Sequence, residues 1–397
     1  MEVLLNTYAR LLKNTRNKYI RYLYDNIAWN NRLIALVGPR GTGKTTMLLQ
    51  HIKKTFPDTK KALYVSLDHL WFSRNSLLDL ADRFNAHGGT HLFIDEVHRY
   101  PNWATEIKNI YDGYPDLHVV FTGSSMLEIY KANVDFSRRA ITYELNGLSF
   151  REFLQFEDKL PCDALSLNDI LKNHRDIAID ITSKIKVLPE FKKYLEYGYY
   201  PFYREDLQTY PIRIEQIVNT VLDNDLPAIE AIEYSSIIKI KKLLAIISGL
   251  VPFVPNIVEL SRDIETNRNS TVKYLYYLNK AGLINNINVQ NKGLNAINKP
   301  DKIYLDNTNL LYALNGSNVN IGCIRETFFA NQLLVEHTVN TAKEGDFTIN
   351  NKFIFEIGGR NKTFTQIKNI KHSYIAADET EIGFGNKIPL WLFGMLY

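Results

Sequence analysis

Short, almost wholly apolar runs alternate with amphipathic stretches between residues 32 and 150. Apolar runs of this length predict strands that are buried on both faces, and the amphipathic stretches between them predict helices. This alternation is typical of a parallel α/β sheet with helices on both sides. The predicted strands are 33–37 (LIALV), 62–67 (ALYVSL), 91–95 (HLFID), 117–123 (LHVVFTG) and 140–145 (AITYEL).

Composition narrows the class of protein. Of the 397 residues, 45% are hydrophobic and 23% are charged, which is typical of a folded globular protein. A net charge of +4 over this length does not by itself indicate nucleic-acid binding. Cys162 and Cys323 lie far apart without metal-binding spacing, so we expect reduced thiols. The chain opens without a signal-like apolar run, and we expect a cytoplasmic protein.

A glycine-rich motif follows the first predicted strand and precedes a helix. Gly38, Gly43, Lys44 and Thr45 form G-x-x-x-x-G-K-T, in which backbone N–H groups cradle phosphates, the lysine reaches the terminal phosphates and the threonine binds Mg²⁺. The alternative, a glycine turn with an exposed lysine, fits this strand–helix context poorly. The predicted ATP-binding residues are Gly38, Pro39, Arg40, Gly41, Thr42, Gly43, Lys44, Thr45 and Thr46.

An acidic pair lies at the end of the third predicted strand. Asp95 and Glu96 would lie at the carboxyl edge of the sheet, where ligands of such sheets bind. There Asp95 can assist Mg²⁺ and Glu96 can orient an attacking water. A solvated helix cap is the alternative for the pair. His98 follows closely, although a single histidine near a helix start is more often structural.

Polar residues at and just after the end of the fourth predicted strand are further candidates. Thr122, Ser124 and Ser125 could bond the γ-phosphate or the attacking water, with an ordinary Ser/Thr turn as the alternative, and Ser124 is the predicted catalytic hydroxyl. Arg138 and Arg139 precede the fifth strand, and we expect Arg139 to stabilise phosphoryl-transfer charge in its own subunit or a neighbour's. Surface charges or structural ion pairs are the alternative.

A basic segment in the middle of the chain predicts two helices joined by a turn. Asn269 and Ser270 are the predicted caps of the second helix. This order, followed by an approach to a strand pair, is typical of a winged helix-turn-helix. The apolar positions that would face the core are Ile257, Leu260, Ile264, Val272, Leu275, Leu278 and Leu283.

The charge of this segment bears on DNA binding. Between residues 236 and 295 there are eight Lys or Arg and three Asp or Glu, a net charge of +5. Double-stranded DNA is therefore a candidate partner, although winged helices also serve as protein–protein modules. The positions expected to be exposed to DNA are Arg268, Thr271, Lys273, Tyr274 and Tyr277.

Three carboxylates near the C-terminus occur in the order of a PD-(D/E)xK nuclease. Glu326, Asp346 and Glu356 could hold a divalent metal, but Gly358 occupies the position of the motif lysine. Lys362 lies close in sequence and could substitute. We expect a nuclease-like fold kept for structure or nucleic-acid binding. The candidate backbone contacts that follow are Gln366 and Lys368.

Several of these stretches together resemble the AAA+ ATPases. The chain resembles most closely a prokaryotic group of ATP-binding proteins of poorly known function, with an AAA-type N-terminal domain and a C-terminal part that often looks like a restriction endonuclease. This resemblance implies a five-stranded parallel core and slow, regulated ATP turnover. The stretches that carry it are GPRGTGKTT, FIDEVHRYPNW, FTGSSMLEI and LNGLSFREFL, and more loosely YLEYGYYPFY, VLDNDLP, KIYLDNTNLLYAL and IRETFFANQLL.

The predicted organisation is an AAA+-type α/β domain (1–155), a helical lid-like segment (156–234), a winged helix-turn-helix (235–298) and a degenerate nuclease-like α+β domain (299–397). The predicted function is Mg-ATP hydrolysis coupled to domain movement, with DNA or a second copy of the chain as candidate partners. Two alternatives stay open. One is a nucleotide-switched DNA-binding regulator with little turnover, and the other is an ATP-regulated nuclease.

Overall fold

The computed structural model describes residues 1–123, 138–229, 232–289, 300–316 and 319–397. The chain divides into two compact units, and each contains stretches that are distant in sequence. The first unit comprises Met1–Asn146 and Asp223–Ile232, and the second comprises Gly147–Leu222 and Glu233–Tyr397. The four-part organisation expected from the sequence stays a prediction.

A five-stranded parallel sheet forms the centre of the first unit, in the order β2-β3-β4-β1-β5. All five predicted strands are confirmed to within one residue at each end. Strands β1 to β4 are buried almost throughout, as their continuous apolar sequence requires. The strands are β1 (Leu33–Val37), β2 (Ala62–Ser66), β3 (His91–Asp95), β4 (His118–Gly123) and β5 (Ile141–Glu144).

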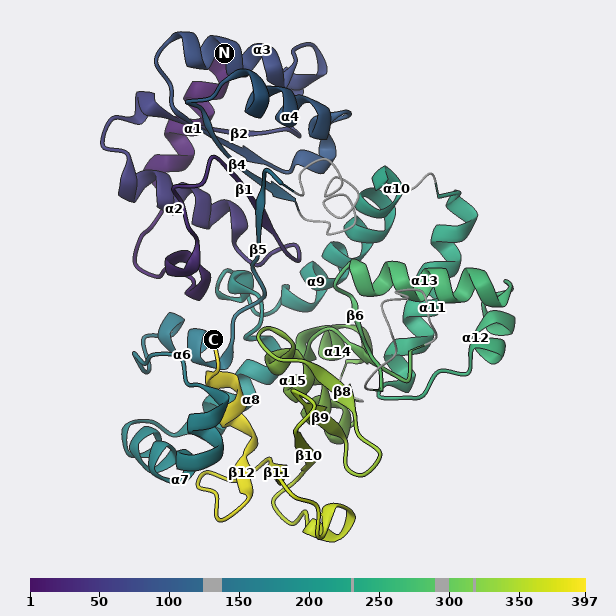
Figure 1. The fold of residues 1–397 in the computed structure, drawn as a ribbon. Coiled ribbons are helices and arrows are strands. Elements are labelled where there is room, and N and C mark those ends of the chain that lie inside the picture. The colour runs from purple at the N-terminus through teal and green to yellow at the C-terminus, as the bar shows by residue number, and fades with distance from the viewer. Residues whose placement is uncertain (124–137, 230–231, 290–299, 317–318) are drawn as a thin grey trace. The chain divides into compact units, whose positions relative to one another are not determined.

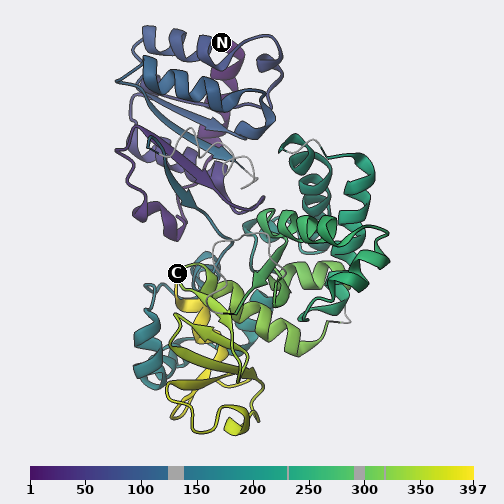
Figure 2. The ribbon, with the colours of Figure 1, turned by 45° about the vertical axis from the view of Figure 1, so that its right-hand side comes forward.

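Helices cover both faces of this sheet. The α1 and α2 helices lie together on one face, and α3 and α4 lie together on the other (Figures 1 and 2). The strand order accounts for this arrangement, because β1 connects to the far edge of the sheet and the chain then returns through β3 and β4. Crossovers between parallel strands are right-handed as a rule, so the two directions of travel place their helices on opposite faces. The helices are α1 (Glu2–Asn14), α2 (Lys44–Thr55), α3 (Leu77–Ala86), α4 (Trp103–Gly113) and α10 (Leu226–Ile229), with short turns η1 (Tyr22–Asn26), η2 (Thr59–Lys61), η3 (Leu70–Ser73) and η4 (Val97–Arg99).

The register of the strands assembles the candidate chemistry at one edge of this sheet. Val37 pairs with Gly123, and Ser66 pairs with Asp95. The phosphate loop after β1, the acidic pair at the end of β3 and Thr122 in β4 therefore share the carboxyl edge, as expected for a parallel sheet of this class.

The second unit is mainly helical and contains two sheets. A mixed sheet has the order β12-β11-β10-β9-β8, and β6 and β7 form an antiparallel pair. Its helices are α6 (Phe150–Phe156), α7 (Leu167–Lys184), α8 (Val187–Tyr197), η5 (Pro201–Arg204), α9 (Tyr210–Thr220), α11 (Tyr234–Leu250), α12 (Ile257–Asp263), α13 (Arg268–Lys280), α14 (Thr308–Asn315), α15 (Ile321–Leu334), η7 (Phe364–Ile367) and η8 (Leu390–Met395). Its strands are β6 (Ile284–Ile287), β7 (Lys302–Leu305), β8 (Val339–Thr341), β9 (Phe347–Ile349), β10 (Phe353–Gly358), β11 (Ser373–Ala377) and β12 (Lys387–Pro389).

A π-helix, η6 (Val221–Asp225), connects the second unit to the returning segment of the first. Such single π turns are rare and occur often at functional sites. The short helix α10 follows directly. Among the helices of the described ranges, none has both the length and the apolar character that a membrane crossing requires.

The helices of the basic segment follow the predicted order, but three predicted exposures are wrong. Thr271, Tyr274 and Tyr277 are buried, and the Tyr274 hydroxyl donates to Ser236 Oγ at 3.0 Å. Thr271, Tyr274 and Leu278 share one face of α13, so the amphipathic tyrosines belong to its core stripe. The predicted cap is also wrong, because Asn267 caps α13 by accepting the backbone N–H of Ser270.

Candidate nucleotide-binding site

The phosphate loop joins β1 to α2 and contains three glycines with positive φ. These φ angles are +140° at Gly38, +81° at Gly41 and +99° at Gly43. A Cβ added at Gly38 would lie 2.2 Å from the carbonyl oxygen of Leu145, so this position also requires glycine for space. The loop therefore packs directly against the end of the β5 segment.

Two cationic side chains hold the phosphate loop in place by hydrogen bonds to its backbone carbonyl oxygens. Lys44 is buried, and its Nζ donates to the carbonyl oxygens of Gly38 and Pro39, each at 2.7 Å. Burial lowers the pKa of Lys44 to about 8. Arg21 donates to the carbonyl oxygens of Thr42 and, at 2.7 Å, of Asn146, which anchors the loop to the chain after β5.

The two predicted metal-binding side chains lie next to each other. Thr45 Oγ1 donates to Asp95 Oδ2 at 2.6 Å. Asp95 also accepts from the Tyr64 hydroxyl at 2.8 Å and from Thr122 Oγ1, and it is 2% exposed. Three hydroxyl groups therefore satisfy a buried carboxylate and fix its orientation at the carboxyl edge.

Glu96 has a left-handed backbone conformation, with φ 53° and ψ 44°. Its N–H donates to Thr122 Oγ1 at 3.2 Å, so Thr122 bridges both acids of the pair. Its carboxylate accepts from the Arg40 guanidinium at 3.0 Å and lies 3.3 Å from His98 Nε2. Non-glycine residues in this conformation cost energy and occur often at functional sites.

A carboxylate that the sequence analysis missed joins this group. Asp225 is in the returning segment, 185 residues beyond Arg40, and its side chain is 1% exposed. Arg40 binds it through Nε at 2.9 Å and through a second nitrogen at 3.2 Å. Arg99 lies at 3.2 Å and His98 Nε2 at 3.3 Å from its Oδ1.

The partners of Asp225 decide its charge. Burial alone would raise the pKa of this carboxyl, but hydrogen bonds from His98 and Arg40 and the charge of Arg40 outweigh burial and lower the pKa well below its ordinary value. The carboxylate is therefore ionised at neutral pH. In the sequence, Asp225 belongs to the stretch VLDNDLP, which contains two aspartates. Nothing in its distance along the chain from the phosphate loop indicates that the two meet.

The remaining predicted residues are not brought to this group. Ser124 and Ser125 lie outside the described residues. Arg139 precedes β5, which runs parallel to β1, so it lies at the amino edge of the sheet and not at the edge of the phosphate loop. There its Nε binds Asp112 at 3.1 Å, and Arg138 is exposed. This position argues against action on a nucleotide of the same subunit, and action in trans within a homo-oligomer stays a prediction.

The three C-terminal carboxylates each have a partner in the second unit. Glu326 accepts from Lys302 at 2.7 Å and from the Tyr304 hydroxyl at 2.8 Å. Asp346 accepts the N–H of Ile357 at 2.7 Å, and burial together with the charges of Glu326 and Glu356 raises its pKa to about 6. No group of three or more His, Cys, Asp or Glu in the described ranges could hold a metal ion.

The Lys362 side chain lies against Gly358, the position of the motif lysine in the predicted nuclease pattern. It forms an ion pair with Glu356, which is 2% exposed. A Cβ added at Gly358 would lie 2.7 Å from Lys362 Cδ, so the lysine side chain lies across the glycine. A lysine from four positions further along the chain is therefore the one that pairs with Glu356, and the nuclease pattern stays a prediction.

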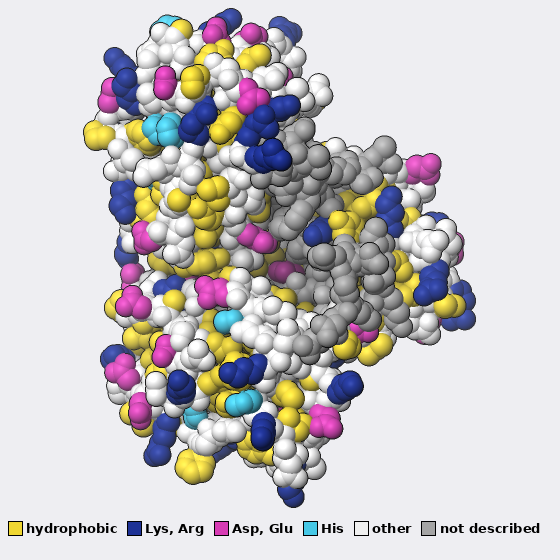
Figure 3. Space-filling view, in the orientation of Figure 1, with side chains coloured by type: hydrophobic (Ala, Val, Ile, Leu, Met, Phe, Trp, Pro, Cys, Tyr) yellow, Lys and Arg dark blue, Asp and Glu magenta, His cyan; other side chains and the backbone are white. Residues whose placement is uncertain are grey.

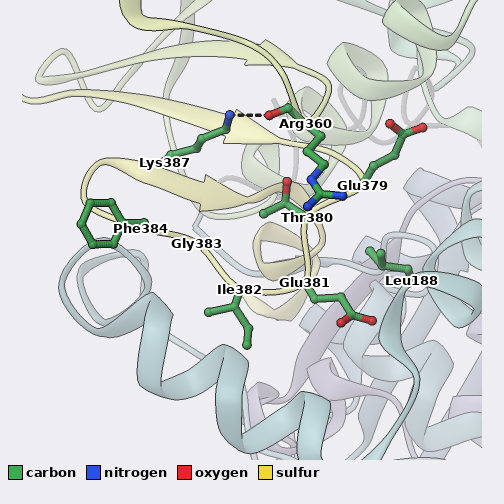
Figure 4. Close-up of a pocket in the computed structure, with 9 residues that line it drawn as sticks. All are labelled: Leu188, Arg360, Glu379, Thr380, Glu381, Ile382, Gly383, Phe384 and Lys387. Carbon is green, nitrogen blue, oxygen red and sulfur yellow. Dashed lines mark hydrogen bonds between the residues drawn. The ribbon is translucent and has the colours of Figure 1, made fainter.

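A hollow of about 590 Å³ lies in the second unit (Figure 4), and its lining includes none of these three carboxylates. Lys387 donates to the carbonyl oxygens of Arg360 and Lys362, so its ammonium is engaged by the chain itself. Two cations and two carboxylates oppose each other here, and the lining favours no ligand class. The lining residues are Leu188, Arg360, Glu379, Thr380, Glu381, Ile382, Gly383, Phe384 and Lys387.

Two known domain families match parts of the chain. Residues 30–154 match a family described as an AAA domain. Residues 188–320 match a second family, described as a domain of unknown function (DUF8612). The AAA-type P-loop α/β core predicted from the sequence is confirmed for the first of these ranges. The winged helix and the nuclease-like domain stay predictions. Comparison with curated proteins gave no match.

Solved structures show similar chains at low identity. The Walker-type ATPase PABY2304 of Pyrococcus abyssi is 11% identical, with a TM-score of 0.43, over 76% of this chain and 97% of that one. AMPPCP-bound DnaA from Aquifex aeolicus is 15% identical, with a TM-score of 0.28, over 67% and 84%. PCH-2 of C. elegans is 22% identical, with a TM-score of 0.25, over 40% and 45%. Similarities of this size carry no functional information.

Proposed function

We propose that the first unit binds Mg-ATP and hydrolyses its β–γ bond. The observation that carries this proposal is the contact of Thr45 with Asp95 at 2.6 Å, beside a glycine-rich loop that contains a buried Lys44. Three glycines with positive φ, a lysine and a helix N-terminus form the phosphate cradle. The match of residues 30–154 to an AAA domain supports the same conclusion.

The residues of the cradle fit the phosphates of ATP. Loop N–H groups and the N-terminus of α2 attract negative charge, and the Lys44 ammonium can exchange its two carbonyl partners for phosphate oxygens. Thr45 and Asp95 offer adjacent hydroxyl and carboxylate oxygens, the ligands that Mg²⁺ prefers. Magnesium, when bound, would neutralise phosphate charge, and these two residues would hold it.

Glu96 is the proposed base. It follows Asp95 directly, and its side chain is 20% exposed, so water can reach the carboxylate. Its backbone bond to Thr122 and its contact with Arg40 hold it beside the phosphate loop. A carboxylate in this place can orient and polarise a water for attack on the terminal phosphorus.

Steady-state ATP hydrolysis by the full chain tests this proposal. We expect Lys44→Ala to lose nucleotide binding and Glu96→Gln to retain binding but lose at least about 100-fold in turnover, a common cost of removing a general base. Lys60→Ala, at an exposed lysine on the same unit, is the matched control and should behave as the wild type. Turnover by Glu96→Gln at the wild-type rate would contradict the assignment of the base.

DNA binding by the basic segment is a second candidate function. Three helices, α11 to α13, precede the antiparallel β6–β7 pair, which is the element order of a winged helix. Arg268 and Lys273 are exposed on α13. On the face seen in Figure 3, however, the described Lys and Arg side chains are scattered among hydrophobic and acidic ones.

Duplex DNA titration tests this second function. We expect the double variant Arg268→Ala, Lys273→Ala to weaken binding and to flatten its salt dependence. Tyr274→Phe should leave DNA affinity unchanged, because its hydroxyl is engaged by Ser236 inside the segment. Equal affinity of wild type and double variant would remove α13 as a DNA contact. An increase of ATP turnover with DNA would connect the two functions.

A further inference from the structure

The returning segment of the first unit ends at the proposed ATP site. The chain leaves this unit after Asn146 and comes back only with Asp223–Ile232, of which residues 223–229 and 232 are described. Both flanking stretches, up to Leu222 and from Glu233, belong to the second unit. The segment is therefore a covalent connection between the second unit and the ATP site, made at two points of the chain.

Asp225 is the anchor of this segment. Its carboxylate is 1% exposed and contacts Arg40, His98 and Arg99, and the neighbouring Leu226 is 1% exposed. Of these partners, His98 and Arg99 belong to η4, directly after Glu96, and Arg40 belongs to the phosphate loop. The segment is thus held by the two elements that would surround the terminal phosphate.

Arg40 is shared between two carboxylates. Its guanidinium binds Asp225 in a bidentate arrangement, at 2.9 and 3.2 Å, and Glu96 at 3.0 Å. Guanidinium groups bind phosphate in the same bidentate manner. A terminal phosphate in the cradle would bring negative charge beside both carboxylates and compete with them for this one cation.

We propose that Asp225 is a positioning residue through which the returning segment responds to ATP, a proposal that rests on the proposed function of this site. Without nucleotide, Asp225 holds Arg40 and, through it, the carboxylate of Glu96. When the terminal phosphate of ATP takes Arg40, Asp225 loses its bidentate partner, and the segment loosens. The change then reaches the second unit through the two covalent connections of the returning segment, at its start and at its end.

Hydrogen exchange of the full chain tests this inference without any substitution. We expect a non-hydrolysable ATP analogue with Mg²⁺ to protect a peptide spanning residues 38–46 and to speed exchange at residues 223–229 by about tenfold or more, with a smaller change in ADP. Protection of 38–46 with no change at 223–229 would overturn the inference and leave the proposed function intact. No protection of 38–46 would instead count against the proposed function itself.

Nucleotide affinity gives a second readout that a merely structural anchor would not produce. If Asp225 competes with phosphate for Arg40, Asp225→Asn should bind the analogue more tightly, by about tenfold, the value of one charge-assisted hydrogen bond. Arg99→Gln should bind it more weakly, because Asp225 would then hold Arg40 more firmly. Asp116→Asn, at an exposed aspartate, is the matched control.

The direction in which nucleotide affinity changes in Asp225→Asn distinguishes competition with phosphate for Arg40 from simple structural support of the site. Weaker binding by a folded Asp225→Asn, checked by its thermal melting, would overturn the inference, because a structural support weakens the site when it is removed. Asp225→Glu, which keeps the charge, should return the affinity toward the wild-type value.

Discussion

The hydroxyl oxygen of Thr45 lies 2.6 Å from a carboxylate oxygen of Asp95, although 50 residues separate them in sequence. Thr45 is in the first turn of α2, and Asp95 ends β3. The parallel register of the sheet brings the two together, because strands β1 and β3 end at the same edge. Two oxygen ligands that can bind one hard cation thus come from separate elements.

Thr45→Ala should therefore weaken nucleotide binding only when magnesium is present. Removal of the hydroxyl takes away one oxygen ligand, and we expect the affinity for ATP in Mg²⁺ to fall by about tenfold or more, by analogy with other losses around metal sites. Titration of a fluorescent ATP analogue with Mg²⁺ and with EDTA measures this difference. Thr59→Ala, an exposed threonine, is the control. An equal loss in EDTA would mean that Thr45 supports the loop and not the metal.

The strands of the first unit were predictable because burial on both faces leaves a plain signal. Runs such as residues 33–37 and 92–94 are apolar without interruption, and a glycine motif after the first and an acidic pair after the second mark where these runs end. The site residues Lys44, Thr45 and Asp95 followed from the same local context. No long-range information was needed to place them.

The contacts that the sequence analysis missed depend on long-range packing. Asp225 is 185 residues beyond Arg40 in sequence and lies at the end of a π-helix. No hydrophobic periodicity in the sequence predicts that the chain returns to the first unit at this point. Tyr274 and Tyr277 were expected on the surface, but an amphipathic side chain on a helix can pack on either side, and only tertiary contacts decide. Lys362 likewise reaches Glu356 by crossing Gly358, from outside the motif spacing.

Gly38→Ala should disrupt the phosphate loop. The added Cβ would lie 2.2 Å from a backbone oxygen of Leu145, and the φ of +140° is rarely adopted by alanine. We expect a loss of at least about 2 kcal/mol in the free energy of unfolding, together with loss of ATP binding. Urea unfolding and nucleotide titration measure the two effects.

Gly113→Ala is the matched control for this substitution. Gly113 ends α4 without a positive φ, and among the described residues beyond its own helix turn and chain neighbours no atom lies within 4 Å of an added Cβ. Alanine there should therefore be neutral or slightly stabilising. Normal ATP binding by Gly38→Ala would show that the loop can move away from Leu145.

The C-terminal carboxylates should not support nuclease activity. Glu326 is held by Lys302 and Tyr304, and the described residues contain no group of three ligands for a metal ion. We expect no nicking of supercoiled plasmid in Mg²⁺ or Mn²⁺, with or without ATP. Metal-dependent nicking that disappears in Asp346→Ala would contradict this expectation and would give Lys362 the role of the motif lysine.

Asp306 should make the second unit less stable as pH rises. It is buried, and it accepts from Tyr199 at 3.3 Å and from Asn307 at 3.0 Å. Burial raises its pKa from 3.8 to about 6. Between these values the folded state keeps its proton while the unfolded chain loses it, so the free energy of unfolding falls as pH rises and the loss is complete above pH 6. A shift of this size corresponds to roughly 2–3 kcal/mol.

Asp306→Asn isolates this contribution, since asparagine keeps the shape of the side chain and cannot ionise. Urea unfolding at intervals from pH 4 to pH 7.5 should show that the variant gains stability relative to the wild type between pH 4 and about pH 6 and that the difference then stays level. The exposed Asp176 on α7 provides the control Asp176→Asn, which should run parallel to the wild type. A constant difference between Asp306→Asn and the wild type across all pH values would mean that Asp306 titrates alike in both states, because only a pKa that differs between folded and unfolded chains makes the difference depend on pH.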